Sequence, residues 1–591
     1  MAQFKPAHKP VNVKTRDKKP PVYSSTKKTS STLLSSFDNW LEKKSGTLII
    51  VIFSLSILFS LLLFQARMDI GGDDSTYILR AYDFIHKGSF PSFQGPFYPM
   101  FLSIFVSFLG INVIFLKSLS LICNFVALLF LYKSFKDRIP PFVLYSVLLL
   151  TAINSYILSF ASLTYSESFF MALQFVFFFY LFKLVDKIKN GNNVPLKESW
   201  KNWLIVGLIV FLMSSARSVG IFALAGLILF FTIQLPPLKK SWEKWFMPPG
   251  IKLIVRIFTN RYIIFLIGAF FIFYIPIGFI EKIVWHAQSQ FGQQSNQYML
   301  KNAYNAADGN ETFNGFIMRF FQNCDLYLSK RFFQIIGLRS FEATDTITGL
   351  TFFFALFFFF CIYRAMKSKN YYLLAVSMYV LSLTGITFLV LQIQWDQPRL
   401  IMVFVPLYLM LFIYGLYDVT KKAPWAMQFL TVFVVFIVAI SECSGTLAKA
   451  KENMPSLSKN LHGDIYAGFT PDWVNYLKLS EWCQNLPKDS IVACRKGPMS
   501  SVYANGREFF NVTKTDNIDN DADSIISWFK RNNVRYILLA KLRLNPSNPD
   551  QGFINTMNRL IIPIARKYPQ KLKFIKQEGT SEEAQLYEVL Y

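Results

Sequence analysis

The chain alternates long apolar runs with short polar segments. Runs of about 18 or more apolar residues are long enough to cross the ~30 Å hydrocarbon core of a bilayer as helices. The pattern therefore predicts a polytopic α-helical membrane protein with about 11 transmembrane helices. The predicted spans are residues 47–64, 111–131, 142–160, 169–185, 203–235 (two spans), 262–280, 349–363, 371–391, 400–417 and 424–440.

Two apolar runs do not have the length of whole spans. Residues 203–235 are too few for two full spans, yet a single helix would place Arg217 in mid-bilayer, where an arginine is costly. We therefore expect two short, tilted helices that turn at residues 214–218. The run at 97–109 is shorter still and predicts a re-entrant or interfacial helix.

The chain after the last predicted span is polar and mixed. It contains strand-like runs at 491–494, 509–512, 536–540, 571–575 and 585–590, and helical patterns at 471–485, 522–532 and 551–568. This combination predicts a small C-terminal α/β domain. The predicted organisation is a basic, disordered N-terminus at 1–46, a transmembrane domain at 47–441 with outer loops at 65–110 and 281–346, and the C-terminal domain at 442–591.

The charge of the chain decides its predicted orientation. There are 61 Lys and Arg against 36 Asp and Glu. If the N-terminus is cytosolic, the cytosolic segments hold 29 basic and 8 acidic residues, as the positive-inside rule requires; they are 1–46, 133–140, 183–201, 236–261, 364–370 and 418–423. The excess of basic residues lies on one face of the membrane, which argues against a nucleic-acid partner. We expect a multi-pass protein of the inner (plasma) membrane with an extracytoplasmic C-terminal domain.

Charged residues gather at the predicted outer ends of the spans: Asp69, Asp73, Asp74, Glu167, Arg217, Asp396 and Arg399. A carboxylate there is suited to act as a general base on a hydroxyl, and arginines are suited to bind a phosphate bidentately. ATP is absent outside the cytosol, so such chemistry needs a lipid-carried or otherwise activated substrate. Helix caps, helix N-terminal acids and surface ion pairs are the alternative interpretations.

No cofactor is indicated with certainty. The six cysteines show no zinc-binding spacing, and a divalent metal is compatible with the outer acids without being required. Cys483 and Cys494 lie in the predicted outer domain, where they form either a disulfide or two separate thiols.

Four short motifs, with their order and sidedness, resemble the GT-C superfamily of polyprenyl-phosphate-sugar-dependent glycosyltransferases, which includes protein O-mannosyltransferases and lipid A aminoarabinose transferases. Asp73-Asp74-Ser75-Thr76-Tyr77 resembles the family's Asp-Glu-x-x-Tyr of the first outer loop. The later motifs that resemble the family are Thr164-x-x-Glu167, Ser214-x-x-Arg217 and Gln397-x-Arg399. The resemblance covers roughly residues 47–591 and implies a GT-C-like fold.

The resemblance also implies roles for individual residues. Asp73 takes the place of the catalytic base, but Asp74 stands where the family usually has Glu, so either acid of the pair is a candidate. Arg399 and Arg217 are the implied ligands of the donor phosphate, with Glu167 and Tyr77 as further substrate-binding residues. Some members carry a phosphate-binding lysine in the first loop, where this chain has Gly95. The phosphate must then bind Arg399, Arg217 or a basic residue of 281–346.

The predicted function is transfer of a sugar from a polyprenyl-phosphate carrier to a hydroxyl acceptor on a lipid, glycan or protein, with inversion at the sugar. The expected partners are this donor, the acceptor and membrane lipid. A transporter or flippase of lipid-linked saccharide is the alternative, because broken helices and intramembrane charges suit it too. A structural scaffold is a third interpretation. Convergence of the outer acids in one place favours the enzyme.

Overall fold

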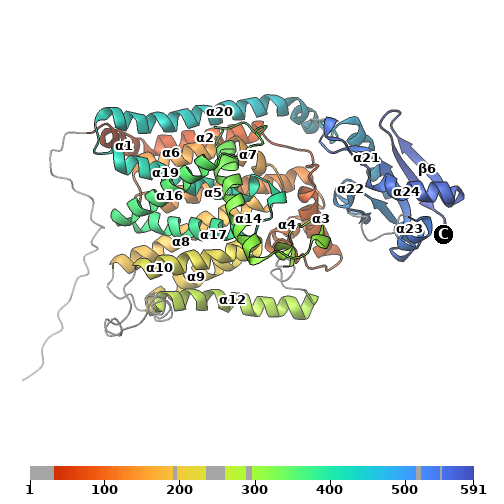
Figure 1. The fold of residues 1–591 in the computed structure, drawn as a ribbon, viewed down its shortest axis with the longest axis horizontal. Coiled ribbons are helices and arrows are strands. Elements are labelled where there is room, and N and C mark those ends of the chain that lie inside the picture. The colour runs from red at the N-terminus through yellow and green to blue at the C-terminus, as the bar shows by residue number, and fades with distance from the viewer. Residues whose placement is uncertain (1–31, 191–195, 235–259, 288–295, 514–520, 546–548) are drawn as a thin grey trace, which may run out of the picture.

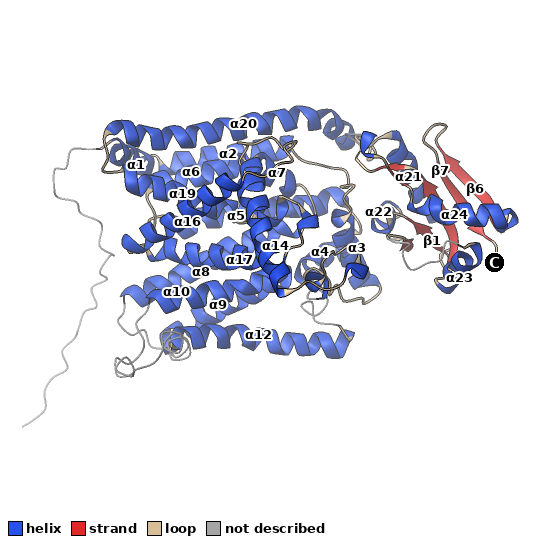
Figure 2. Cartoon of the chain, in the orientation of Figure 1, coloured by secondary structure: helices blue, strands red, loops and turns tan. Residues whose placement is uncertain are grey.

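The computed structural model describes residues 32–190, 196–234, 260–287, 296–513, 521–545 and 549–591. These residues form a bundle of long helices with a smaller α/β domain at one end (Figures 1 and 2). The bundle comprises α1 (Leu33–Lys43), α2 (Ser45–Leu62), α3 (Asp73–His86), α4 (Phe97–Leu109), α5 (Val113–Phe135), α6 (Pro141–Ile153), α7 (Ser155–Ala161), α8 (Ser166–Asn190), α9 (Leu196–Ala216), α10 (Ala223–Gln234), α12 (Arg261–Trp285), α14 (Phe313–Cys324), α15 (Phe332–Ile335), α16 (Thr348–Lys367), α17 (Tyr371–Val390), α18 (Arg399–Met402), α19 (Val405–Thr420) and α20 (Trp425–Leu461).

The helices confirm a polytopic membrane protein. Among the described residues, eight helices are long and apolar enough to cross a bilayer, and the bent pair of α6 and α7 makes a ninth. The shorter apolar helices α10 and α19 coincide with the remaining predicted spans. The predicted short helix at 97–109 is α4.

One predicted span is bent rather than straight. The run at 142–160 divides into α6 and α7, which meet at an angle of 57°. Asn154 causes the break, because its side chain accepts a hydrogen bond from the backbone N–H of Ile157 at 2.8 Å and so begins a new helix. The amide of Asn154 also donates to the carbonyl oxygen of Ile335 at 2.8 Å, which fixes the bend within the bundle.

The prediction of disorder over the whole of 1–46 is wrong for its last part. α1 begins after Thr32, whose hydroxyl accepts from the N–H of Ser35 at 3.3 Å. Leu34 and Leu41 are buried on one helix face, and the N–H of Leu34 donates to Gln428 of α20 at 3.0 Å. Leu34 and Leu41 are seven residues apart, which is two turns of a helix, and this spacing is the helical signal that the basic composition concealed. Residues 1–31 lie outside the described residues.

Polar segments separate to the two ends of the bundle. Arg138 pairs with Asp186 at 2.6 Å, and Asn370 donates to the carbonyl oxygen of Arg138 at 3.1 Å. Asp38 of α1 accepts from Tyr417 at 2.5 Å. These contacts lie in or next to segments predicted to be cytosolic, whereas α3 and α4 lie at the opposite end, beside the C-terminal domain (Figure 1). The orientation of the two ends stays a prediction from the charge pattern.

The C-terminal domain has the predicted α/β character. Its five-stranded sheet has the order β2-β1-β3-β7-β6; β1 is parallel to β2 and β3, and β7 is antiparallel to β3 and β6. The strands are β1 (Ile491–Cys494), β2 (Phe509–Asn511), β3 (Val534–Ala540), β6 (Leu572–Glu578) and β7 (Ala584–Val589), with a separate pair, β4 (Leu542–Arg543) and β5 (Phe553–Ile554). The helices are α21 (Pro471–Trp482), α22 (Gly497–Tyr503), α23 (Ala522–Arg531) and α24 (Thr556–Lys567).

A single helix connects the two parts of the molecule. α20 runs along the bundle and reaches the C-terminal domain (Figure 1), so the predicted boundary at 441/442 falls inside this helix. α22 packs against α3 of the bundle. The C-terminal domain therefore lies next to the acidic first loop.

Candidate active site

The acidic loop makes a tight turn into α3. Gly72 has φ +95°, a left-handed conformation that favours glycine, and it directly precedes the helix. Asp73 and Asp74 are the first two residues of α3. Successive residues of a helix point about 100° apart, so the two carboxylates face different surroundings.

Asp73 faces an arginine from a distant part of the chain. Its Oδ2 lies 2.5 Å from Nη2 of Arg399, which opens α18. The Asp73 side chain remains 33% exposed, against 18% for Arg399. Arg399 is held in place by a bond from its Nε to Gln397 at 2.6 Å and by the ring of Tyr165, whose centre is 4.9 Å from the guanidinium. This pair is accessible at the end of the bundle.

Glu167 joins a second arginine to the same place. Glu167 lies in the first turn of α8, and its Oε1 is 2.6 Å from Arg217 and 3.9 Å from Arg399. Arg217 is extended at the break between α9 and a 3-10 helix, so the predicted turn at 214–218 is confirmed. Ser166 lies 3.3 Å from the hydroxyl of Tyr77 and 3.5 Å from Arg217.

The structure thus brings together most of the predicted site residues. Four segments far apart in sequence meet, and their charged groups are two carboxylates and two guanidiniums. We call this group the Asp73–Arg399 cluster. Its members are Asp73, Tyr77, Glu167, Arg217 and Arg399.

Asp74 lies apart from that cluster. Its side chain is fully buried and 2.8 Å from Nζ of Lys117. Its oxygens also accept from the backbone N–H groups of Thr164 at 2.9 Å and Asp69 at 3.2 Å, and from the Thr164 hydroxyl. Asp74 therefore joins α3 to α5 and to the loop before α8. Its partner Lys117 was missed from the sequence, where it is only a lone lysine in a predicted span.

Asp69 is linked to the cluster through an aromatic ring. The Tyr165 hydroxyl donates to Oδ2 of Asp69 at 2.5 Å, and the same ring packs against Arg399. Burial raises the pKa of Asp69 above its ordinary value, although the Tyr165 hydrogen bond opposes this. Tyr165 is a further site residue that the motifs did not single out.

Asp396 has other partners. The sequence allows an Asp396–Arg399 surface pair, but Asp396 lies 2.5 Å from Nε of Arg331 and 3.2 Å from Nζ of Lys330. These two basic residues of the outer loop share one carboxylate as their ionic partner. Arg217 and Arg399 are the arginines that pair with the carboxylates of the cluster.

The outer acids do not form a metal-binding group. Within the ranges that the structure describes, no three or more His, Cys, Asp and Glu side chains are arranged to hold a metal ion. Asp73 and Asp74 instead pair with different cations, as given above. Cys483 and Cys494 are both buried, free thiols.

Gly95, at the position where some GT-C members carry a lysine, is packed too closely for any side chain. It has φ +94°, and a Cβ there would overlap the carbonyl oxygen of Ala216, next to Arg217. A lysine has no room here, because at position 95 the backbone of the loop lies directly against the backbone of Ala216.

We expect Gly95→Ala to be more destabilising than Gly88→Ala. Gly88 has φ +64° with open space around it, so alanine there adds only the left-handed strain of about 1–2 kcal/mol. Gly95→Ala adds overpacking of about 1–3 kcal/mol more. Thermal unfolding in detergent measures the difference. Equal midpoints for the two variants would contradict the close packing on Ala216.

The comparisons with known proteins concern the fold. No protein-family model matches the chain. No curated protein sequence matches it either. Solved structures do match. The apo oligosaccharyltransferase of Archaeoglobus fulgidus has a TM-score of 0.50 and 11% identity, over 83% of this chain and 69% of that one.

Two further structures are similar at lower scores. The A. fulgidus oligosaccharyltransferase AglB, in complex with an inhibitory peptide and a dolichol-phosphate, has a TM-score of 0.47 and 13% identity, over 83% of this chain and 69% of that one. ArnT from Cupriavidus metallidurans, bound to undecaprenyl phosphate, has a TM-score of 0.48 and 10% identity, over 91% and 97%. The likeness to the apo oligosaccharyltransferase shows that the two chains share a fold, in agreement with the GT-C-like fold that the motifs implied.

Proposed function

We propose that this protein is a membrane glycosyltransferase that moves a sugar from a polyprenyl-phosphate carrier to a hydroxyl of a lipid, glycan or protein acceptor. The observation that carries the proposal is the convergence of Asp73, Glu167, Arg217 and Arg399 from four distant segments at one end of the bundle. Isolated, solvated acids would need no such convergence. The GT-C fold, shared with the apo oligosaccharyltransferase, agrees with it.

Asp73 is the proposed general base. Its carboxylate is one-third exposed and lies at the N-terminal end of α3, where an acceptor hydroxyl can reach it. Asp74 is fully buried and surrounded by donors from Lys117, Thr164 and Asp69, so it has no access to an acceptor. The geometry favours Asp73 over Asp74.

Arg217 and Arg399 are the proposed ligands of the donor phosphate, with Glu167 and Tyr77 orienting them and the substrate. The acceptor oxygen forms a bond to the anomeric carbon while the bond from that carbon to the phosphate oxygen breaks. The acceptor proton passes to Asp73, and polyprenyl phosphate leaves with the electron pair. A single displacement inverts the anomeric carbon. Because phosphate is a good leaving group, catalysis depends mainly on positioning and on the base.

Transfer of label tests the proposal. Membranes containing the protein are supplied with a mixed pool of radiolabelled polyprenyl-phosphate sugars, and the acceptor fraction is counted and its anomer determined by NMR. We expect label in an acceptor, with the anomer opposite to that of the donor. Movement of intact lipid-linked sugar across the bilayer without transfer would instead establish the flippase alternative. A product that retains the donor's anomer would exclude the single displacement.

A further inference from the structure

Lys496 of the C-terminal domain contacts the acidic turn at residues 69–74. Lys496 directly precedes α22, and its Nζ donates to the carbonyl oxygen of Ile70 at 2.7 Å. Its own backbone N–H donates to the hydroxyl of Tyr476 at 3.1 Å, and its ammonium lies 5.7 Å from the centre of the Trp473 ring. The side chain is thus held by its own domain and directed at the turn that leads into Asp73.

The position of Lys496 connects it to the Asp73–Arg399 cluster. Ile70 follows Asp69, which accepts from Tyr165, and the Tyr165 ring packs on the guanidinium of Arg399. Lys496 and Arg399 therefore lie on two flanks of the same acidic turn. The carboxylates of Asp69 and Asp73 both act electrostatically on the Lys496 ammonium.

The charge balance of the site leaves a role for a further cation. Within the Asp73–Arg399 cluster itself, two carboxylates balance two guanidiniums before a donor binds, and the neighbouring Arg80 donates to the carbonyl oxygen of Phe93 at 2.9 Å. Lys117 is paired with Asp74, and Lys330 and Arg331 share the single carboxylate of Asp396. A phosphate entering a neutral, partly desolvated cluster needs an additional positive charge. The ammonium of Lys496 is bonded to a neutral carbonyl oxygen, a weaker partner than an anion.

We propose that Lys496 is a substrate-binding residue, by which the C-terminal domain supplies an ammonium ligand for the phosphate of the lipid-linked donor. This deepens the proposed function and rests on it for the identity of the ligand. The C-terminal domain becomes part of the site rather than an appendage to the bundle.

The ionisation of Lys496 gives the proposal a pH signature. Burial, and next the positive charge of Arg495, lower the pKa of Lys496 to about 8, while Asp69 and Asp73 act in the opposite direction. Phosphate binds the charged ammonium, so affinity should fall as the pH rises through and above this value. An arginine at 496 stays charged and should abolish that fall.

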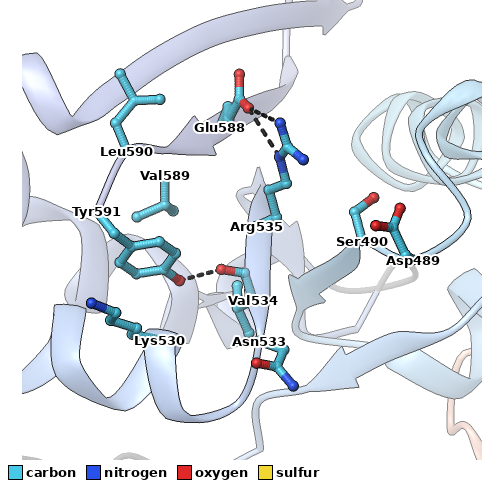
Figure 3. A pocket seen from close by; sticks show the side chains of 10 residues that line it. All are labelled: Asp489, Ser490, Lys530, Asn533, Val534, Arg535, Glu588, Val589, Leu590 and Tyr591. Atoms are coloured by element: carbon cyan, nitrogen blue, oxygen red, sulfur yellow. Dashed lines mark hydrogen bonds and ion pairs between the residues drawn. The ribbon is translucent and has the colours of Figure 1, made fainter.

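The test is binding of a sugar-free polyprenyl phosphate to the full chain in lipid nanodiscs, with polyprenol and inorganic phosphate as further probes. Lys496→Met should lower the affinity for polyprenyl phosphate about tenfold or more and leave the affinity for polyprenol unchanged. Lys496→Arg should retain most of the affinity and lose the fall between about pH 7 and 9. The matched control is Lys530→Met, which removes the same charge from α23 of the same domain. Lys530 lies in a pocket with Asn533 and Tyr591 (Figure 3).

Each outcome decides the proposal. Unchanged polyprenyl-phosphate affinity in Lys496→Met overturns it, as does an equal loss for polyprenol, which would mean that Lys496 only docks the domain. If inorganic phosphate competes with polyprenyl phosphate in the wild type but not in Lys496→Met, Lys496 contacts the phosphate directly, whether or not the lipid adds affinity. If sugar transfer depends on Asp73 but Lys496→Met binds polyprenyl phosphate normally, this inference is wrong and the proposed function stands. If phosphate binding depends on Lys496 but no sugar transfer is detected, the proposed function is wrong and this inference stands.

Discussion

Replacing Asp73 by asparagine is expected to lower sugar transfer at least about 100-fold, because a general base of this kind contributes roughly 10²–10⁴-fold to rate. Asparagine has the same shape but cannot take the acceptor proton. Arg399 keeps Glu167 as a neighbour at 3.9 Å, so the variant still holds a guanidinium at the site. The measurement is label transfer per molecule of protein at equal expression.

Binding separates loss of the base from loss of the site. Removal of a negative charge beside Arg399 should leave polyprenyl-phosphate affinity unchanged or higher, since phosphate no longer competes with the Asp73 carboxylate for the guanidinium. Asp83→Asn is the matched control: the same substitution on the same helix removes a partly exposed pair with Lys87 at 3.1 Å. Near-normal transfer by Asp73→Asn would exclude Asp73 as the base. Lost phosphate affinity would make it a positioning residue.

The spans were predictable because a bilayer imposes a length and a composition on every crossing helix. The bend at Asn154 was not, since it depends on partners from other segments, such as the carbonyl oxygen of Ile335. The order of the charged motifs located the site along the chain. It did not determine which ions pair, and Arg399 pairs with Asp73 rather than with its sequence neighbour Asp396.

Residues from outside the motifs were the hardest to predict. Lys117, Tyr165 and Lys496 contact the acidic turn only because α5, the loop before α8 and the C-terminal domain meet there. Asp73 and Asp74 are adjacent in sequence, and no pattern of residues separates their roles. Their separation comes from the direction in which α3 leaves the Gly72 turn, which is a property of the tertiary structure.

The buried Asp74–Lys117 pair predicts the largest effect on stability. Both side chains are fully buried, with Nζ of Lys117 2.8 Å from Asp74 and 2.5 Å from the carbonyl oxygen of Arg67. Lys117→Met leaves the Asp74 carboxylate buried without its cation, a change that costs about 3–5 kcal/mol. We expect a large fall in the thermal midpoint of unfolding in detergent. Lys87→Met, which removes an exposed lysine, should change stability by no more than about 0.5 kcal/mol.

The double variant Lys117→Met with Asp74→Asn isolates the unpaired charge as the cause. It removes both ions, while the amide oxygen of the new side chain can still accept from the N–H groups of Thr164 and Asp69, so it should recover much of the stability lost in Lys117→Met. Transfer should recover with it, because Asp74 acts by fixing the start of α3 and thus the direction of Asp73. If Lys117→Met were as stable as Lys87→Met, the buried pair would not be what holds α3 to α5. If the double variant regained stability but not transfer, the Asp74 carboxylate itself would take part in the reaction.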